Sequence, residues 1–364
     1  MLVSEIDTPA LLVDLNVMER NLQRVADYTK AHGLRLRPHT KTHKSPRIGQ
    51  RQLELGAAGL TVAKVGEAEV MLGASPADLL VAYPVIGRSK LERLMAVARR
   101  TRVTVSLDSL FAARQLSQAA QAAGVNIGVL AETDVGLGRV GVSPGPDLLD
   151  LARGMQRLPG LSFEGIAFYP GHIKDNGDAG KAAVAALSDL LRSILDDFRR
   201  AGIDAPVVSG GSTPSLYHSH EIAGLNEVRP GTYVYNDWNT VMTGACDIQD
   251  CAVSVLVTVV STARPGQIIV DGGSKTFSSD GVANSSAATF GCVMESPASI
   301  FHKMNEEHGY VDVRQTGRKF EMEERLRIVP NHVCVAVNLH ERMYGIRDGA
   351  VEEVWEVAGR GKLQ

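Results

Sequence analysis

The chain has 364 residues, of which 44% are hydrophobic and 22% charged, and its formal net charge is -3. Its isoelectric point is about 6.4. Because the chain has no basic stripe interleaved with aromatic residues, we expect no nucleic-acid partner. Its apolar runs stop well short of the roughly 20 residues of a membrane span, and its first residues lack the basic start and apolar core of a signal peptide, so we expect a cytoplasmic protein with no membrane partner. Four irregularly spaced cysteines are too few for a disulfide scaffold.

The first predicted element is a strand at residues 10–14, ahead of a regular alternation of β-rich runs and helical stretches from about residue 34 to 240. The alternating strands are predicted at residues 34–37, 59–63, 79–83, 103–107, 127–132, 165–169, 206–209 and 227–234. Helices are predicted at residues 91–100, 110–123, 148–158 and 181–201. About eight strand–helix units in roughly 200 residues favour an α/β fold of the (β/α)8 TIM-like barrel type, with a doubly wound open sheet as the alternative.

Beyond Gly244 the pattern changes to strands and turns without a convincing long helix. The strands are predicted at residues 253–260, 267–270, 326–329, 333–339 and 344–346. Asp348 and Gly349 have the composition of a two-residue hairpin turn. We therefore predict a barrel domain at residues 20–244 and a C-terminal all-β domain formed by residues 245–364 with residues 1–19, whose strand joins it.

Lys41 lies between the first barrel strand and a predicted helix, in the segment Pro38-His39-Thr40-Lys41-Thr42. Most lysines are solvated surface charges. A lysine held rigidly at a strand end can instead form a Schiff base and act as a covalent catalyst. The other motifs of the chain decide between these interpretations.

Two glycine-containing turns follow predicted strands. Ser209-Gly210-Gly211-Ser212-Thr213-Pro214 comes after the seventh barrel strand, where barrels often bind phosphate through backbone N–H groups and hydroxyls. Gly136-Leu137-Gly138-Arg139-Val140-Gly141 matches the dinucleotide-binding pattern, but it follows the fifth strand and lacks the acidic residue at the end of the next strand. We interpret Arg139 as a fixed cation that points at a ligand.

His332 and Cys334 are predicted in one strand, at positions i and i+2, so that both side chains share a face. An imidazole and a thiolate are two ligands for zinc or a similar metal. Two buried residues without a metal are the simpler interpretation of such a pair. Further imidazoles, from His172 and His308, are expected to reach the same cleft.

Four motifs, in this order, resemble one family of enzymes. They are Pro38-His39-Thr40-Lys41-Thr42, Glu132-Thr133-Asp134 through Gly141, Ser209-Gly210-Gly211-Ser212-Thr213-Pro214 and Pro330-Asn331-His332-Val333-Cys334. The family is the D-threonine aldolase and D-serine dehydratase group of metal-activated, fold-type III pyridoxal phosphate enzymes, with an alanine-racemase-like barrel and a C-terminal β domain. The resemblance runs from Thr8 to the end of the chain, and the last residues look more like the aldolase branch.

The resemblance implies a role for each matching residue. Lys41 would hold pyridoxal 5'-phosphate covalently, and Arg139 would face its pyridine nitrogen. Tyr169 would lie near the cofactor and His172 near the metal. The phosphate would be bound by Gly211, Ser212, Thr213 and Tyr233, and a divalent metal (Zn, Mn or Mg) by His332 and Cys334. A homodimer is also expected, because the group includes dimers with shared active sites.

Two reactions fit these parts. In an aldolase, His172 would take the proton of the β-hydroxyl of a D-β-hydroxy-α-amino acid, which then splits into glycine and an aldehyde. In a D-serine or D-3-hydroxyaspartate dehydratase, Lys41 would remove the α-proton and the products would be ammonia and a 2-oxo acid. The His–Cys pair is familiar from the dehydratases, whereas some aldolases of the group carry a carboxylate where Cys334 stands. The resemblance favours the aldolase.

Three other classes of protein share part of these sequence features. A non-catalytic pyridoxal phosphate carrier would lack the β domain and the His332–Cys334 pair. An amino-acid racemase would need an acid–base tyrosine from the β domain, for which Tyr310 and Tyr344 are available. An NAD oxidoreductase is supported only by the glycine pattern and predicts no covalent adduct on Lys41.

Overall fold

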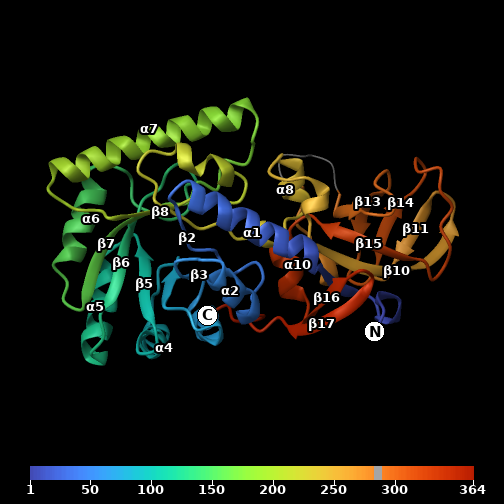
Figure 1. The fold of residues 1–364 in the computed structure, drawn as a ribbon, viewed down its shortest axis with the longest axis horizontal. Helices are drawn as coiled ribbons and strands as arrows, with labels where there is room; N and C mark the ends of the chain where they lie inside the picture. Colours follow the sequence, from blue (N-terminus) through green and yellow to red (C-terminus); the bar gives the residue numbers. More distant parts are fainter. Residues whose placement is uncertain (283–288) are drawn as a thin grey trace. The chain divides into compact units, whose positions relative to one another are not determined.

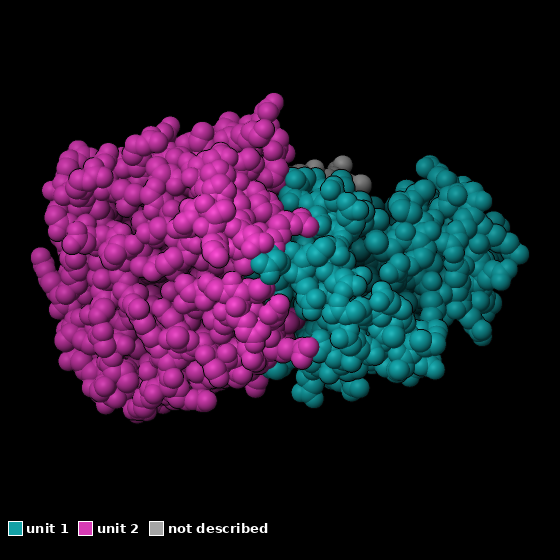
Figure 2. Space-filling model, in the orientation of Figure 1, with its two compact units in different colours: residues 1–23, 42–44, 232–360 teal, residues 24–41, 45–231, 361–364 magenta. Residues whose placement is uncertain are grey.

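The computed structural model describes residues 1–282 and 289–364. These residues form two compact units, drawn in teal and magenta in Figure 2. Unit 1 consists of Met1–Gln23, Thr42–Lys44 and Thr232–Arg360, and unit 2 of Arg24–Lys41, Ser45–Gly231 and Gly361–Gln364. The chain therefore passes between the units at Lys41 and Thr42. The domain boundaries expected near residues 20 and 244 stay a prediction.

Unit 2 is built on an eight-stranded parallel sheet (Figure 1). In chain order the strands are β2 (Arg35–Leu36), β3 (Leu60–Val62), β4 (Asp78–Val81), β5 (Arg102–Leu107), β6 (Ile127–Glu132), β7 (Leu161–Ala167), β8 (Val207–Gly210) and β9 (Glu227–Val228). They are arranged β2-β9-β8-β7-β6-β5-β4-β3, and a parallel bridge between His39 and Thr61 brings the chain after β2 alongside β3. The sheet thus closes into the predicted barrel, and the open-sheet alternative is wrong.

Helices follow the barrel strands on the outside of the sheet (Figure 1). They are α2 (Pro46–Glu54), α3 (Val65–Met71), η2 (Leu72–Ala74), α4 (Arg88–Ala98), α5 (Leu110–Ala123), α6 (Pro146–Gln156), α7 (Asp178–Arg200) and η3 (Leu216–Glu221). The long helix α7 buries Leu187, Leu191 and Ile194 on one stripe, because apolar residues recur there at intervals of three and four. α1 (Leu15–Ala31) precedes the barrel and was not predicted.

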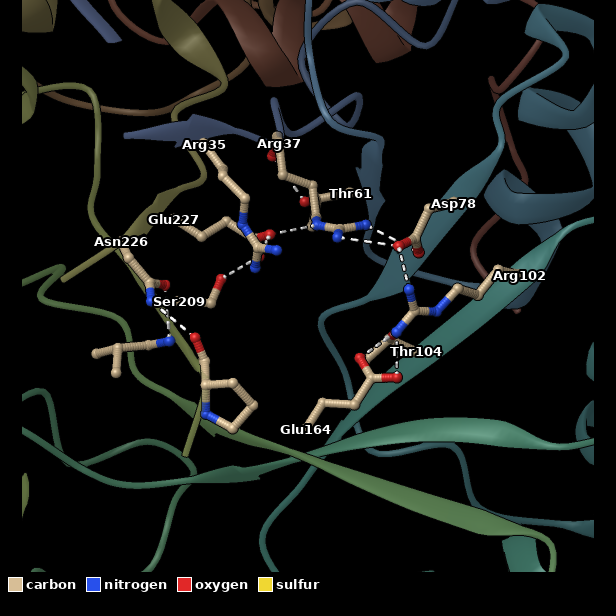
Figure 3. Close-up of polar contacts among 12 residues, drawn as sticks. Arg35, Arg37, Thr61, Asp78, Arg102, Thr104, Glu164, Ser209, Asn226 and Glu227 are labelled. Carbon is tan, nitrogen blue, oxygen red and sulfur yellow. Dashed lines mark hydrogen bonds and ion pairs between the residues drawn. The ribbon is translucent and has the colours of Figure 1, made fainter. Parts of the chain in front are cut away.

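Charged side chains fill part of the barrel interior (Figure 3). The buried guanidinium of Arg37 contacts Asp78 and Glu227, each at 3.0 Å. Burial disfavours its charge, but Glu227 and Asp78 together raise the pKa of Arg37 above its ordinary value. Arg102 continues the network to Glu164 at 2.6 Å. Because the charges of Arg37, Asp78 and Glu227 are paired, they can be buried in an interior that apolar residues would otherwise fill, whereas Arg102 is largely exposed.

Unit 1 contains a second, mostly antiparallel sheet of nine strands (Figure 1). They are β1 (Ala10–Asp14), β10 (Val253–Arg264), β11 (Gln267–Val270), β12 (Gly291–Val293), β13 (Ile300–Met304), β14 (Gly309–Asp312), β15 (Arg325–Pro330), β16 (Arg342–Arg347) and β17 (Ala350–Glu356). β1 pairs with β10 in antiparallel and with β16 in parallel orientation. This confirms that the first strand belongs to the β domain.

Unit 1 also contains short helices, one of which was predicted as a strand. They are η1 (Val3–Glu5), η4 (Thr232–Val234), α8 (Trp238–Met242), η5 (Ile248–Asp250), α9 (Ser274–Phe277) and α10 (Val333–Leu339). The predicted strand at residues 333–339 is wrong, because this run forms helix α10 and buries Val333, Ala336 and Val337 on one helical face. β-Branched residues favour strands only weakly, and packing overrides that preference here.

Other local predictions agree with the structure. α5, β6 and β11 have the predicted bounds. Asp348 and Gly349 join β16 to β17 with φ angles of 50° and 78°, which is the left-handed geometry of a tight hairpin turn. Within the described ranges, no helix has both the length and the apolar composition that a membrane crossing requires.

Candidate active site

The segment that carries Lys41 is fixed between two strands of the barrel. The backbone N–H of His39 donates to the carbonyl of Pro230 at 2.9 Å, and that of Thr40 donates to the carbonyl of Thr61 at 2.8 Å. The Thr40 hydroxyl also donates to the Thr61 carbonyl, at 3.1 Å. Lys41 follows directly, so its main chain is anchored at the carboxyl end of the barrel strands, where (β/α)8 enzymes carry their active sites.

Three predicted site residues meet around one aromatic ring in unit 2. The Lys41 ammonium lies 5.9 Å from the centroid of the Tyr169 ring, and the Arg139 guanidinium carbon lies 5.1 Å from it. Tyr169 can take this place because Gly171 has no side chain: a Cβ there would lie 2.3 Å from a carbon of the ring. The structure therefore groups Lys41, Arg139 and Tyr169, which the family resemblance places beside one cofactor.

The glycine pattern around Arg139 forms a loop that encloses a carboxylate. Asp134 accepts hydrogen bonds from the backbone N–H groups of Gly138, Gly136 and Leu137 at 3.0–3.1 Å. These bonds, led by the one from Gly138, lower the pKa of Asp134 below its ordinary value. Because the amides already bind this carboxylate, they do not form a dinucleotide phosphate site, in agreement with the prediction.

The same loop packs against His172. Gly136 has a φ of +121°, and a Cβ at this position would lie 3.2 Å from both Cε1 and Nε2 of His172. Glycine is thus required twice, for its backbone angle and for its contact with the imidazole. The loop of Asp134 and Gly136 fixes one side of His172.

The turn after β8 has the properties of a phosphate-binding loop. Gly211 has a φ of +85°, and the hydroxyls of Ser212 and Ser215 lie 3.1 Å apart. Ser212, Thr213 and Ser219 are buried. The Ser219 hydroxyl has no hydrogen-bond partner among the residues that the structure describes, and it lies 3.7 Å from the position of a Cβ on Gly211. Buried hydroxyls beside a side-chain-free backbone fit a phosphate group.

A buried arginine, missed in the sequence, lies at the end of β9. Arg229 donates to the carbonyl of Phe168 at 2.7 Å. Burial lowers its pKa, and the charges of Glu132 and Glu227 oppose that shift. Its only sequence signal is its position directly after a barrel strand.

In unit 1 the predicted metal ligands lie at the start of helix α10. His332 is the N-cap and Cys334 is in the first turn, not in a strand. The Thr42 hydroxyl lies 3.1 Å from the Cys334 sulfur. A hydrogen bond with Cys334 raises the pKa of His332 to about 10, although burial acts in the opposite direction. The imidazole and the thiol are therefore neighbours, in spite of the wrong prediction of secondary structure. Tyr233 is buried on η4 of the same unit.

Two carboxylates around this pair were missed in the sequence. Asp237 is buried at the N-cap of α8 and accepts hydrogen bonds from the backbone N–H groups of Thr240 at 2.9 Å and Val333 at 3.1 Å. Burial raises its pKa. The helix-capping pattern Asp237-Trp238-Asn239-Thr240 could have identified Asp237 as an N-cap residue in the sequence. Asp280 lies 2.7 Å from Nδ1 of His332, and no local pattern marks it.

Nitrogen and sulfur donors of this kind suit a divalent metal of the zinc type. The adjacent imidazole and thiol thus fit the implied metal. Among the described residues, no group of three or more His, Cys, Asp and Glu side chains is arranged to hold a metal ion. His308, expected to add an imidazole, lies in the turn between β13 and β14, where its carbonyl accepts a hydrogen bond from Asn305 at 2.9 Å.

Comparison with known proteins identifies the family. Residues 13–237 match the alanine racemase N-terminal domain, and residues 252–346 match a serine dehydratase domain. The chain is 33% identical to a D-threonine aldolase of Arthrobacter, over 99% of this chain and 94% of the relative. It is 32% identical to a D-threo-3-hydroxyaspartate dehydratase of Delftia, over 90% of this chain and 91% of the relative.

A solved structure agrees with these relatives. The crystal structure of D-threonine aldolase from Filomicrobium marinum superposes with a TM-score of 0.93 at 34% identity, covering 100% of this chain and 99% of that one. The matches to aldolases along the whole chain support the aldolase interpretation of the sequence. The chain belongs to the D-threonine aldolase and D-serine dehydratase group of alanine-racemase-like enzymes, and it is a pyridoxal phosphate-dependent lyase.

Proposed function

We propose that the protein is a metal-dependent D-threonine aldolase-type lyase, which cleaves D-β-hydroxy-α-amino acids to glycine and an aldehyde. The observation that carries the proposal is the grouping of Lys41, Arg139 and Tyr169 at the barrel strand ends, in a chain that resembles a D-threonine aldolase over its whole length.

The proposal assigns the cofactor to residues of the barrel and of η4. Lys41 holds it covalently, Tyr169 lies beside it, and Arg139 faces its ring nitrogen. An arginine does not give up its proton, so Arg139 favours an unprotonated ring nitrogen. The phosphate is held by Gly211, Ser212, Thr213 and Tyr233. Pyridoxal phosphate, when bound, supplies a conjugated ring that stabilises negative charge at the α-carbon of an amino acid.

His332 and Cys334 hold the divalent metal in this proposal. Of zinc, manganese and magnesium, zinc suits a soft thiolate best. A divalent metal, when bound, supplies a positive charge that lowers the pKa of a nearby hydroxyl group.

His172 is the general base in the proposed reaction. It takes the proton of the substrate β-hydroxyl while the bond between the α- and β-carbons breaks. The β-carbon leaves as an aldehyde, the electron pair of the bond remains on the side of the α-carbon, and protonation there gives glycine. Gly136 assists because it packs against one face of the imidazole. This contact restricts rotation of the His172 ring away from the substrate β-hydroxyl.

Cys334 favours a second candidate reaction. A thiolate beside His332 is the ligand set that the sequence resemblance connects with dehydratases, and a dehydratase relative matches most of the chain. In that reaction Lys41 removes the α-proton and the β-hydroxyl leaves as water. The enamine that results tautomerises to an imine, which adds water and releases ammonia to give a 2-oxo acid.

The proposal extends to the setting of the enzyme. Its substrate is a small D-amino acid, it acts in the cytoplasm, and it works as a homodimer. The first two follow from the family resemblance and from the sequence composition, and the third from the resemblance alone. Size-exclusion chromatography with light scattering measures the oligomeric state.

Product analysis separates the two reactions. The cofactor-loaded protein is incubated with D-threonine, with and without added zinc or manganese, and L-threonine serves as the matched control substrate. We expect glycine and acetaldehyde in equal amounts from D-threonine, and loss of both after chelation. Ammonia and 2-oxobutanoate instead would establish the dehydratase.

A further inference from the structure

Asp280 makes a direct polar contact with the proposed metal ligand His332. Its Oδ2 lies 2.7 Å from the Nδ1 of His332. Both side chains are partly exposed, with 45% of the Asp280 side chain and 41% of the His332 side chain accessible. A metal ion from solution can therefore reach the pair. The carboxylate is hydrogen-bonded to Nδ1, one of the two nitrogens of the imidazole.

Asp280 is held in place by the residue before His332. The Asn331 side-chain amide donates to the carbonyls of Asp280 at 2.9 Å and of Thr289 at 2.5 Å. Asn331 is buried. The hydroxyl of Ser278 accepts the backbone N–H of Asp280 at 3.2 Å. Because Asn331 and His332 are consecutive, one short segment fixes both the imidazole and the backbone that carries its carboxylate partner.

The contact determines which nitrogen of His332 can bind a metal. A neutral imidazole carries its proton on one nitrogen and a lone pair on the other. A carboxylate at Nδ1 accepts that proton in a hydrogen bond and leaves the lone pair on Nε2. In known metal sites such a carboxylate partner orients the ring and raises its basicity, and its loss weakens metal binding.

We propose that Asp280 is a positioning residue, which holds His332 with Nδ1–H toward its own carboxylate and Nε2 toward the metal. The inference rests on the proposed metal site of His332 and Cys334, and it adds a residue that acts on the metal only through His332. Asp280 is not a third ligand in this proposal.

Metal affinity measures the effect directly. The dissociation constant for Zn²⁺ is determined by competition with a chromophoric chelator for wild type, Asp280→Ala and Asp280→Asn. We expect roughly 10- to 100-fold weaker binding for D280A. D280N should lie between D280A and wild type, because its amide oxygen still accepts a hydrogen bond from Nδ1. Glu306→Ala is the matched control, since it removes an exposed carboxylate of the same unit without touching His332.

The absorption spectrum of the Co²⁺-substituted protein distinguishes positioning from ligation. We expect the thiolate-to-cobalt band and the ligand-field pattern to be the same in all variants at saturating Co²⁺, because the ligands are unchanged. A ligand-field pattern that changes in D280A would overturn the proposal and make Asp280 a ligand. Equal Zn²⁺ affinity of wild type and D280A would overturn it as well. If wild type bound no Zn²⁺, the metal site itself would fail, and the role of Asp280 with it.

Discussion

The hydroxyl of Thr42 lies 3.1 Å from the sulfur of Cys334, although 292 positions separate the two residues in the chain. Thr42 is fully buried and directly follows Lys41. A second hydroxyl, from Thr232, lies 3.9 Å from the same sulfur. The residue after the proposed cofactor lysine thus contacts a proposed metal ligand. Hydrogen bonds to a sulfur ligand affect the metal affinity of a site.

Thr42→Val removes the hydroxyl and keeps the shape of the side chain. We expect Zn²⁺ to bind several-fold more weakly, because the sulfur of Cys334 loses a hydrogen bond, and cofactor binding to be unchanged. Chelator competition measures the first effect and cofactor absorbance the second. Thr42→Ser retains the hydroxyl and should bind Zn²⁺ like wild type. Equal affinity in Thr42→Val would show that the contact does not affect the metal.

Gly136→Ala tests the contact between the glycine loop and His172. A Cβ at 3.2 Å from the imidazole requires the ring to shift by a few tenths of an ångström, so we expect kcat to fall by several-fold with little change in KM. Gly145→Ala is the matched control: Gly145 also has a large positive φ, of +105°, but nothing lies within 4 Å of its Cβ position. Equal losses in both variants would assign the effect to backbone strain.

The carboxylate of Asp134 should make the stability of the protein depend on pH. Its pKa is lower in the folded state, chiefly through the N–H of Gly138. Its stabilising contribution is therefore present above the ordinary pKa of 3.8, and it is lost as the pH falls through the folded value. We expect Asp134→Asn to lower Tm at about pH 7 and to differ much less from wild type at about pH 3. A Tm difference that is the same at both pH values would contradict this account.

The buried and the exposed ion pairs of this barrel network should differ in their effect on stability. Glu227→Gln leaves the buried charge of Arg37 without one of its two partners, and we expect a loss of about 3 kcal/mol in the free energy of unfolding. Glu164→Gln should cost less than about 1 kcal/mol, because its partner Arg102 is 60% exposed. Urea denaturation measures both. The idea fails if the two variants lose the same free energy.

The barrel could be predicted from the sequence because each of its signals is local. Alternating β-rich and helical runs give the order of the elements, and right-handed parallel connections leave few ways to arrange them. Lys41 and Arg139 follow barrel strands, so the order of the elements predicts them at one end of the barrel, whereas the place of Tyr169 beside them was implied by the family resemblance. The glycine pattern was also interpreted correctly as no dinucleotide site, from its place after the fifth strand.

The surroundings of the predicted metal ligands could not be predicted in the same way. Asp280 is separated from His332 by 52 positions and contacts it in a part of the chain without a regular element. Val333 begins a helix because the buried carboxylate of Asp237 accepts its N–H, and this tertiary contact overrides a sequence that favours a strand. Contacts of this kind leave no periodic pattern in the sequence.

In the reaction that we propose, one set of residues holds the cofactor, another holds the metal, and carbon–carbon cleavage needs both. The most direct measurement follows D-threonine by NMR with wild type, Lys41→Ala and His332→Ala, in parallel with cofactor absorbance and metal content. The account predicts glycine and acetaldehyde from wild type only, no covalent cofactor in Lys41→Ala, and retained cofactor without metal in His332→Ala. Cleavage at the wild-type rate by metal-free His332→Ala would contradict it.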